Sequence, residues 1–343
     1  MRLFCFYNIV ILLARCYMIK ISDHRYDHMI YNRLGNSGLK LPAISLGLWQ
    51  NFGSQYDYTN IENMCYTAFN AGITHFDLAN TYGHPYNGSA ETNFGKVLKG
   101  GLGEYRDELV ISTKAGYEMW PGPYGDRNGS RKYLIASLDQ SLRRMGLDYV
   151  DIFYHHVYDP LTPLEETAHA LDQIVRQGKA LYVGISNYKR ETTAKMQSIL
   201  KDLGTPFVVN QPSYSMLNRW IEEDGLKDYA RDNGLGLAVF SPLYRGALST
   251  KYLGGVTDEM LAQGKGKNIT ADMVVKLNQL NDIALSRGQT LSQMALSWIL
   301  RDGVVTTVLT GASSPEQILQ NVGAISNLEW DKDTLDKIDL ILK

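Results

Sequence analysis

From Tyr31 onward, short apolar runs alternate with helical patterns, and this rhythm limits the possible folds more than any other feature. Eight apolar runs recur, at residues 44–48, 73–78, 109–113, 149–154, 181–185, 207–209, 237–240 and 306–309. They lack strict apolar–polar alternation, as expected for strands buried on both faces. Helical periodicity fits residues 60–70, 89–99, 131–145, 163–176, 190–203, 220–232 and 291–300. Eight strand–helix units in roughly 300 residues predict an α/β protein, a (β/α)8 TIM barrel, with an open doubly wound sheet as the alternative.

The amino-terminal part of the chain does not follow this rhythm. A β-hairpin is predicted at residues 31–41, with the turn Gly35-Asn-Ser-Gly. Residues 1–28 are predicted to be an N-terminal extension, and residues 29–343 the barrel domain. The apolar run at residues 3–14 is too short to span a bilayer. Three interpretations stay open: a stretch that is not native, with translation starting at Met18 or Met29; a signal peptide; or a frayed extension.

Composition excludes several classes of function. The 343 residues carry 34 Lys and Arg against 36 Asp and Glu, a net charge of −2, which gives no reason to expect nucleic acid or membrane as a partner. Three scattered cysteines argue against a disulfide framework and favour a reducing compartment, so we expect a cytoplasmic protein. The chain has no Rossmann fingerprint, Walker A loop or His-Glu-x-x-His motif, and we expect no metal. A homo-oligomer stays open.

Four polar residues stand at or just after the ends of consecutive predicted strands. Asp77 ends the second strand and Tyr82 follows it, Lys114 ends the third strand, and His156 ends the fourth. In a barrel these positions meet on one rim. A free tyrosine, with a pKa near 10, is a poor acid at neutral pH, and a neighbouring lysine cation is expected to lower that pKa. The four residues therefore predict a proton-transfer site.

At this point the chain resembles the aldo-keto reductase family, over about residues 31–343. The resemblance is carried by the segments around Asp77 and Tyr82, Lys114 and His156, and by Gly184-Ile-Ser-Asn, Val209-Asn-Gln-Pro and Gly311-Ala-Ser-Ser. It implies an NADPH-dependent carbonyl reductase. Tyr82 would be the general acid, Lys114 its pKa modulator, Asp77 the partner of Lys114, and His156 the group that orients the carbonyl. His155 is the alternative by register, but the family's histidine lies five residues after the strand-four aspartate, which selects His156.

The resemblance also implies a cofactor site for NADPH/NADP+. Ser186, Asn187 and Gln211 would hold the nicotinamide carboxamide, and Phe240 would stack on the ring. The full predicted set is Trp49, Asp77, Ser186, Asn187, Gln211, Phe240, Ser241, Leu243, Arg245, Gly246, Lys251, Gly311, Ser313, Gln317 and Asn321. A helix start is predicted at the phosphates, with Ser314 as N-cap and Pro315 at the first position. No Lys or Arg lies between residues 304 and 321, so Lys251 or Arg245 would contact the 2′-phosphate.

Within the family, residues 46–53, 114–124 and 211–220 are similar to the branch that reduces L-glyceraldehyde 3-phosphate and methylglyoxal. The predicted substrate is accordingly a small aldehyde, with Trp49, Tyr117, Trp120 and Tyr124 as pocket walls and Arg127 or Arg131 at a substrate phosphate. That branch often has arginine after the catalytic histidine, and Val157 stands there instead. Potassium-channel β-subunits resemble this branch too. The alternative function is therefore a regulatory module that binds NADPH with little turnover.

Overall fold

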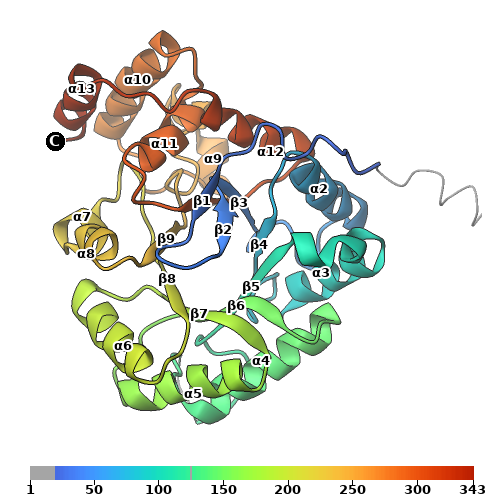
Figure 1. Cartoon of the computed structure of the whole chain (residues 1–343). Coiled ribbons are helices and arrows are strands. Elements are labelled where there is room, and N and C mark those ends of the chain that lie inside the picture. The colour runs from blue at the N-terminus through green and yellow to red at the C-terminus, as the bar shows by residue number, and fades with distance from the viewer. Residues whose placement is uncertain (1–19, 124–125) are drawn as a thin grey trace, which may run out of the picture.

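Eight parallel strands close into a barrel in the computed structural model, which describes residues 20–123 and 126–343 (Figure 1). The strands are β3 (Ile44–Gly47), β4 (His75–Asp77), β5 (Val110–Ala115), β6 (Val150–His155), β7 (Ala180–Ser186), β8 (Phe207–Gln211), β9 (Gly236–Val239) and β10 (Thr307–Thr310). Their order around the ring follows the sequence, and β10 pairs with β3 to close it. The predicted TIM barrel is confirmed, and the open-sheet alternative is wrong.

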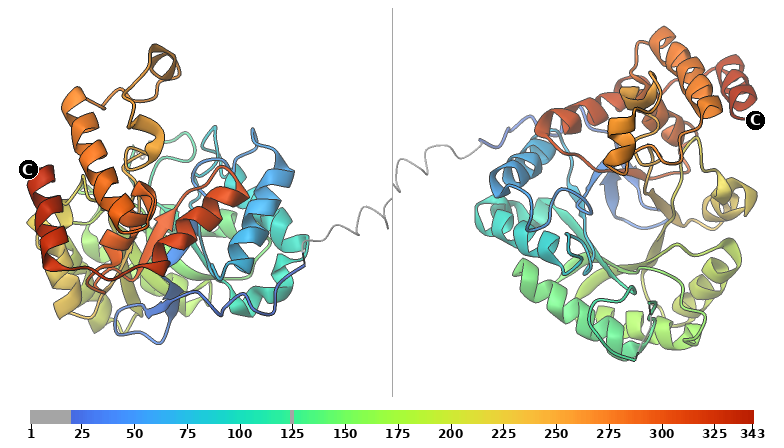
Figure 2. Two further views of the ribbon diagram at one scale, coloured as in Figure 1. Left: turned by 90° about the horizontal axis from the view of Figure 1, so that it is seen from above. Right: turned by 180° about the vertical axis from the view of Figure 1, so that it is seen from behind.

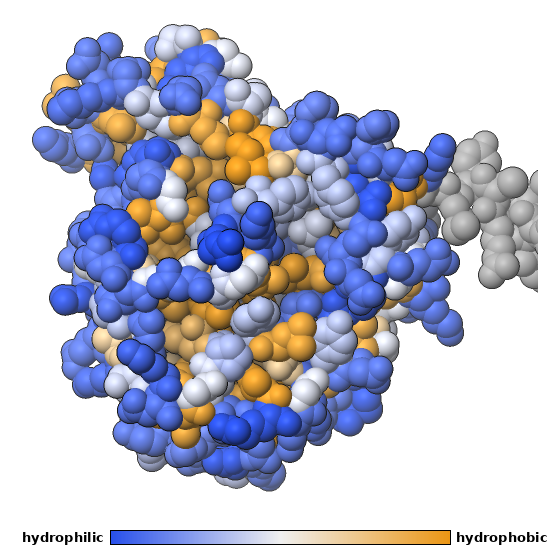
Figure 3. Space-filling model, in the orientation of Figure 1, coloured by the Kyte–Doolittle hydropathy of each residue, from blue (hydrophilic) through white to orange (hydrophobic). Residues whose placement is uncertain are grey.

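The predicted hairpin is confirmed as β1 (Tyr31–Arg33) and β2 (Lys40–Pro42), which lie across the amino-terminal mouth of the barrel (Figure 1). Leu34 and Leu41 are fully buried in a cluster with Ile152 and Tyr154 from the barrel interior. The hairpin thus closes this end of the barrel with apolar side chains. Figure 3 shows the same face, with hydrophilic residues predominating around its edge and apolar side chains visible in the hollows.

Helices surround the barrel, and the short helix Asp258–Ala262 lies in the long segment after β9 that projects beyond the ring (Figures 1 and 2). They are α2 (Tyr58–Asn70), α3 (Ser89–Lys99), α4 (Arg131–Met145), α5 (Leu164–Arg176), α6 (Arg190–Asp202), α7 (Trp220–Glu223), α8 (Leu226–Asp232), α9 (Asp258–Ala262), α10 (Ala271–Ser286), α11 (Leu291–Leu300), α12 (Pro315–Val322) and α13 (Lys332–Leu342), with the 3-10 turns η2 (Leu102–Glu108), η3 (Thr250–Tyr252) and η4 (Gly323–Ser326).

Local sequence signals explain where several helices begin and end. In α4 the Ser130 hydroxyl accepts from the Tyr133 amide, and Gly146 ends the helix with a φ of 68°, so the predicted bounds are met. The single helix predicted at residues 220–232 is wrong. Gly225 has a φ of 73°, which a continuing helix does not allow, and this residue separates α7 from α8.

Residues 20–28 pack on the outside of the barrel rather than apart from it. The Ser22 amide donates to Asn70 Oδ1 at 2.8 Å, and the Arg25 guanidinium lies 5.0 Å from the ring centroid of Phe69. The boundary at residue 29 stays a prediction. Among the described residues, no helix combines the length and apolar character needed to cross a bilayer. The three interpretations of the first residues concern a segment that lies mostly outside the described residues.

Candidate active site

Three neighbouring strands bring the predicted proton-transfer residues to one rim. Asp77 ends β4 and Lys114 is the penultimate residue of β5, while His156 directly follows β6. The parallel register pairs Asp77 with Ser112 and Lys114 with Tyr154, so the carboxyl ends of the three strands lie side by side. The backbone amide of His156 donates to the Ala115 carbonyl at 2.9 Å, which fixes the start of its loop against β5. Strand pairing therefore sets the spacing of the site.

The Lys114 ammonium lies at the centre of the site and contacts three oxygen atoms. It forms an ion pair with Asp77, donates to the Leu78 carbonyl at 2.7 Å, and lies 3.4 Å from the Tyr82 hydroxyl. Lys114 is fully buried and Asp77 is 2% exposed. Burial lowers the pKa of Lys114, and the Asp77 charge opposes that shift. A buried lysine is tolerated here because a carboxylate and a carbonyl accept hydrogen bonds from its ammonium group.

Asp77 accepts hydrogen bonds on both carboxylate oxygens. Oδ2 receives the Lys114 ammonium, while Oδ1 receives the Ser112 hydroxyl at 2.7 Å and the Gln211 amide at 3.1 Å. A carboxylate with donors on both sides is held in one orientation.

The structure places His156, and not His155, beside Tyr82. The rings of Tyr82 and His156 lie 5.8 Å apart, edge to face. His155 is bonded through Nδ1 to the Tyr188 hydroxyl at 2.6 Å instead. Burial lowers the pKa of His156 well below its ordinary value of 6.5, and the cationic form is further disfavoured by Lys114. His156 is therefore a neutral imidazole at physiological pH.

The pKa of Tyr82 is raised well above 10, first by burial and then by the charge of Asp77, so the predicted net lowering of this pKa is not found. Because the ammonium of Lys114 is paired with Asp77, the negative charge of that carboxylate accompanies the cation beside the phenol. What the pair does supply is a donor next to the phenol oxygen, which matters once that oxygen becomes negative.

The three residues predicted to hold a nicotinamide carboxamide form one hydrogen-bonded group at the ends of β7 and β8. The Ser186 hydroxyl donates to the Gln211 carbonyl at 2.8 Å, and the Asn187 side chain donates to the His156 carbonyl at 3.1 Å. Asn187 has a φ of 59°, a conformation uncommon outside glycine. Because Gln211 also bonds Asp77, this group is connected to the proton-transfer residues.

The loop after β9 has an unusual backbone conformation. Ser241, Tyr244, Arg245 and Gly246 all have positive φ, between 47° and 85°. The amides of Tyr244 and Gly246 donate to the carbonyls of Ser241 and Leu243 at 3.0 and 2.9 Å, so these residues form tight turns within the loop. Arg245 and Lys251 are exposed, and neither forms an ion pair within the described part of the chain. Phe240 and Leu243 in the same loop are half-buried.

The loop after β10 leads into the predicted helix start at residues 314–315. The Ser314 hydroxyl accepts from the Gln317 amide and Pro315 opens α12, so the predicted N-cap is confirmed. Gly311 is open to space, since a Cβ there would meet no atom within 4 Å. The side-chain nitrogen of Asn321 is buried without a hydrogen-bond partner among the described residues. Gln317 Oε1 accepts from the Ser313 amide at 2.8 Å, so Gln317 also braces this loop.

Of the predicted substrate residues, two border the catalytic rings. Trp49 is 45% exposed, and its ring lies 6.4 Å from that of Tyr82. The Tyr117 ring meets His156 edge-on at 4.7 Å, and Tyr117 also bridges to Arg127 through a strand-like backbone pair. Trp120 instead stacks 4.6 Å from Tyr133.

The remaining substrate predictions separate by position. Arg127 is exposed on the rim, whereas Arg131 bonds Gln173 on the outer helices, so Arg131 does not point to the substrate mouth. Tyr124 lies outside the described residues.

The sequence matches the Aldo/keto reductase family over residues 43–343. The chain belongs to the aldo-keto reductase family. It is 52% identical over 326 residues to an L-glyceraldehyde 3-phosphate reductase of Escherichia coli (strain K12), covering 93% of this chain and 94% of that protein. It is 33% identical to a probable voltage-gated potassium channel subunit beta of Oryza sativa subsp. japonica, covering 92% and 97%. Family membership and the reductase relatives support an oxidoreductase that uses a nicotinamide cofactor.

Two residues next to the proton-transfer residues of this aldo-keto reductase are not predicted from the sequence. Ser112 binds Asp77 directly, and His75 binds Ser112 at 2.9 Å. Their spacing in the sequence could have indicated them. Residues 75 and 77 lie on the same side of β4, and residues 112 and 114 lie on the same side of β5.

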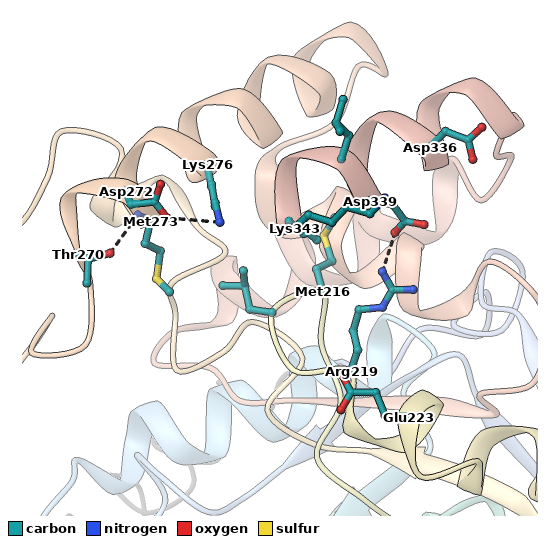
Figure 4. A pocket seen from close by; sticks show the side chains of 13 residues that line it. Met216, Arg219, Glu223, Thr270, Asp272, Met273, Lys276, Asp336, Asp339 and Lys343 are labelled. Carbon is teal, nitrogen blue, oxygen red and sulfur yellow. Dashed lines mark hydrogen bonds and ion pairs between the residues drawn. The ribbon is translucent and has the colours of Figure 1, made fainter.

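A hollow on the described surface lies away from this site (Figure 4). It has a volume of about 790 Å³ and lies between α10, α13 and the segment after β8. Arg219 points across it and donates to Asp339 at 2.6 Å, while Lys276 pairs with Asp272. None of the predicted site residues lines this hollow. Among the described residues, no cluster of His, Cys, Asp or Glu could hold a metal ion.

Proposed function

We propose that this protein reduces small aldehydes with NADPH, and that Tyr82 is the general acid. One observation carries the proposal: the Lys114 ammonium contacts Asp77 and also lies 3.4 Å from the Tyr82 hydroxyl, at a rim bordered by the neutral His156. These groups can deliver one proton to a carbonyl oxygen and stabilise the anion left behind.

Each residue has a separate task in the proposed reaction. Bound NADPH supplies a hydride to the carbonyl carbon. Tyr82 donates its hydroxyl proton to the carbonyl oxygen and becomes a phenolate. Lys114 donates a hydrogen bond to that phenolate, which offsets the effect of burial on the phenol. His156, kept neutral by burial, donates an N–H to the carbonyl oxygen and fixes its direction.

The nicotinamide end of the cofactor would be held by Ser186, Asn187 and Gln211, with Phe240 against the ring. The preference for NADPH over NADH would come from Arg245 and Lys251, whose exposed cations have no carboxylate partner in the described structure. The loop after β9, which carries the exposed Arg245, would lie at the pyrophosphate, and Asn321 would meet the adenosine end through its unpaired side-chain nitrogen.

The proposed substrates are L-glyceraldehyde 3-phosphate and methylglyoxal. The first is named in the 52% identical relative, and Arg127 beside Tyr117 supplies an exposed cation for its phosphate. Val157 replaces the arginine that is frequent in this branch, which favours the unphosphorylated aldehyde. We also propose a cytoplasmic location, on the grounds of cysteine usage.

The proposal is tested by following NADPH oxidation with the purified protein and each aldehyde. We expect turnover with methylglyoxal at least as efficient, in kcat/KM, as with L-glyceraldehyde 3-phosphate. Binding of NADPH without turnover of either aldehyde would contradict the proposal and would favour the regulatory binding module suggested by the channel-subunit relative.

A further inference from the structure

A line of buried hydroxyl and imidazole groups runs behind Asp77 inside the barrel. The Ser112 hydroxyl bonds Asp77 at 2.7 Å, and His75 Nε2 lies 2.9 Å from Ser112 Oγ. On its other side, His75 Nδ1 lies 2.9 Å from Ser45 Oγ, which lies 2.6 Å from Thr307 Oγ1. The four residues behind Asp77 are fully buried and come from four strands, β4, β5, β3 and β10.

Chemistry fixes the direction of every proton in this line. An ionised carboxylate only accepts, so Ser112 must give its single proton to Asp77. Ser112 then accepts from His75, which makes Nε2 the protonated nitrogen and Nδ1 the acceptor. Nδ1 accepts from Ser45, and Ser45 in turn accepts from Thr307. With Asp77 ionised and His75 neutral, no other arrangement satisfies all four contacts.

We propose that His75 is a positioning residue for the reduction: through Ser112 it keeps a hydrogen-bond donor aimed at Asp77, and so sets how strongly Asp77 acts on Lys114 and Tyr82. This inference rests on the proposed function. His75 touches neither the phenol nor the rim, and it acts only through Ser112.

The environment of His75 keeps it in the neutral form that this role requires. Burial lowers the pKa of His75 to about 4; Asp77 opposes the shift and Lys114 adds to it. Ser45 and Ser112, the side chains bonded to its ring nitrogens, are uncharged, and so is Thr307 behind Ser45. The imidazole therefore holds one proton, on Nε2, throughout the neutral range.

The consequence is expected at the phenol. Asp77 raises the pKa of Tyr82, and a hydrogen bond from Ser112 withdraws part of that negative charge. Removing the donor should raise the pKa of Tyr82 further and weaken it as an acid. The titratable groups that face Tyr82 are Asp77 on β4, Lys114 on β5, Tyr117 after β5, and Tyr154 and His156 at β6.

The test compares three variants by the dependence of kcat on pH. We expect Ser112→Ala and His75→Phe each to lower kcat by roughly tenfold, the order of a lost hydrogen bond to a charged group. The alkaline limb of the profile should move to higher pH, while KM for methylglyoxal and Kd for NADPH change less than twofold. His75→Gln places an amide N–H near the position of Nε2 and should restore most of kcat.

Ser137→Ala is the matched control, because Ser137 is a fully buried serine on α4 with no hydrogen-bond partner among the described residues. Its kcat and pH profile should equal those of the wild type. A kcat within twofold of wild type and an unmoved alkaline limb in Ser112→Ala would overturn the inference. So would an equal loss in Ser137→Ala, or a failure of His75→Gln to recover.

A second measurement separates this inference from the proposed function. Nitrogen-15 NMR of histidine-labelled protein reports which ring nitrogen carries the proton, and the His75 signal is assigned by its loss in His75→Phe. We expect a proton on Nε2 alone at neutral pH. A proton on Nδ1 would overturn the relay even if the wild type reduces aldehydes. A wild type that reduces nothing would instead overturn the proposed function, whatever the tautomer of His75.

Discussion

The two halves of the site are built differently. The proton-transfer half stands on the ends of β4, β5 and β6, where Lys114 and Asp77 are buried and are bonded to each other, to Ser112 and to the Leu78 carbonyl. The proposed cofactor half stands on the loops after β9 and β10, where Arg245 and Lys251 are exposed and Asn321 keeps a free amide. The first half is held together by buried hydrogen bonds, while the second presents exposed cations that a ligand would meet. Chemistry and binding should therefore respond separately to mutation.

The largest separation is expected for Tyr82→Phe. Phenylalanine keeps the ring beside Trp49 and loses only the proton, so kcat should fall by roughly 10²–10⁴-fold, the usual contribution of a positioned acid. Kd for NADPH should change less than twofold. Tyr86→Phe is the matched control, an exposed tyrosine in the same loop, and should leave kcat unchanged. A loss below tenfold in Tyr82→Phe would remove Tyr82 from the acid role.

Acid should unfold the protein through its strand-borne histidines. Burial lowers the pKa of His75 and of His155 to about 4, and that of His156 well below 6.5. Below about pH 6.5 the unfolded chain binds these protons and the folded chain does not, so stability is complete above 6.5 and falls as pH falls. Each imidazole contributes ~1.4 kcal/mol per pH unit over that range.

Urea unfolding at a series of pH values between 7.5 and 5 measures this slope. His155→Phe removes one of the three groups and should reduce the slope, whereas His28→Gln, at an exposed position, should not. A free energy of unfolding that stays flat between pH 6.5 and 5 would show that these histidines are not buried in the neutral form.

The ion pair is expected to act as one unit. Lys114→Met keeps the aliphatic bulk and removes the donor that stabilises the phenolate, so kcat should fall by roughly 10²-fold. Asp77→Asn should cost about tenfold, because the lysine stays but loses its counter-charge. The double variant should lose less than the product of the two, since both act through one network.

Lys227→Met provides the control for the ion pair. Lys227 is also a buried lysine, paired with Asp302 at 2.6 Å on the outside of the barrel. The substitution Lys227→Met should lower the free energy of unfolding and leave kcat unchanged. If the kcat loss of the double variant equals the product of the losses of Lys114→Met and Asp77→Asn, the two residues act independently and the proposed coupling is wrong.

The two halves also differ in how far the sequence predicts them. The strand ends follow from periodicity, because a buried strand followed by a helix leaves its last side chains on the rim, and Asp77, Lys114 and His156 all lie there. The N-cap at Ser314 is a local signal and was read correctly. The break at Gly225 was missed because periodicity continues across it, and only the positive φ of that residue reveals the interruption.

What the sequence could not supply depends on the environment of each group. The spacing of Lys114 and Tyr82 indicates an interaction, but the direction of the Tyr82 pKa shift depends on burial and on the pairing of Lys114 with Asp77. The bond between His75 and Ser112 depends on strand register, which brings two otherwise ordinary polar residues together. The free amide of Asn321 likewise appears only in three dimensions.

The smallest effect is expected in the loop half, where a single exposed cation is removed. Arg245→Ala should weaken the binding of NADPH by roughly three- to tenfold and the binding of NADH by less than twofold. The reason is that only NADPH carries the 2′-phosphate that the guanidinium would contact. Binding can be followed by quenching of tryptophan fluorescence, since Trp49 stands at the rim beside Tyr82. The value of kcat at saturating NADPH should stay within twofold of wild type, which distinguishes this half from the strand-borne half.

The dependence of cofactor affinity on salt concentration tests the same contact. Because ions screen exposed charges, rising ionic strength should weaken the binding of NADPH more than that of NADH in the wild type. This difference in salt dependence should be smaller in Arg245→Ala. Arg143→Ala is the control, an exposed arginine on α4, and should leave both affinities and both salt slopes unchanged. If Lys251→Ala reproduces the loss and Arg245→Ala does not, Lys251 holds the phosphate. Equal affinities and equal salt slopes for the two cofactors in the wild type would mean that neither cation reads the 2′-phosphate, and the proposed NADPH preference would then be wrong.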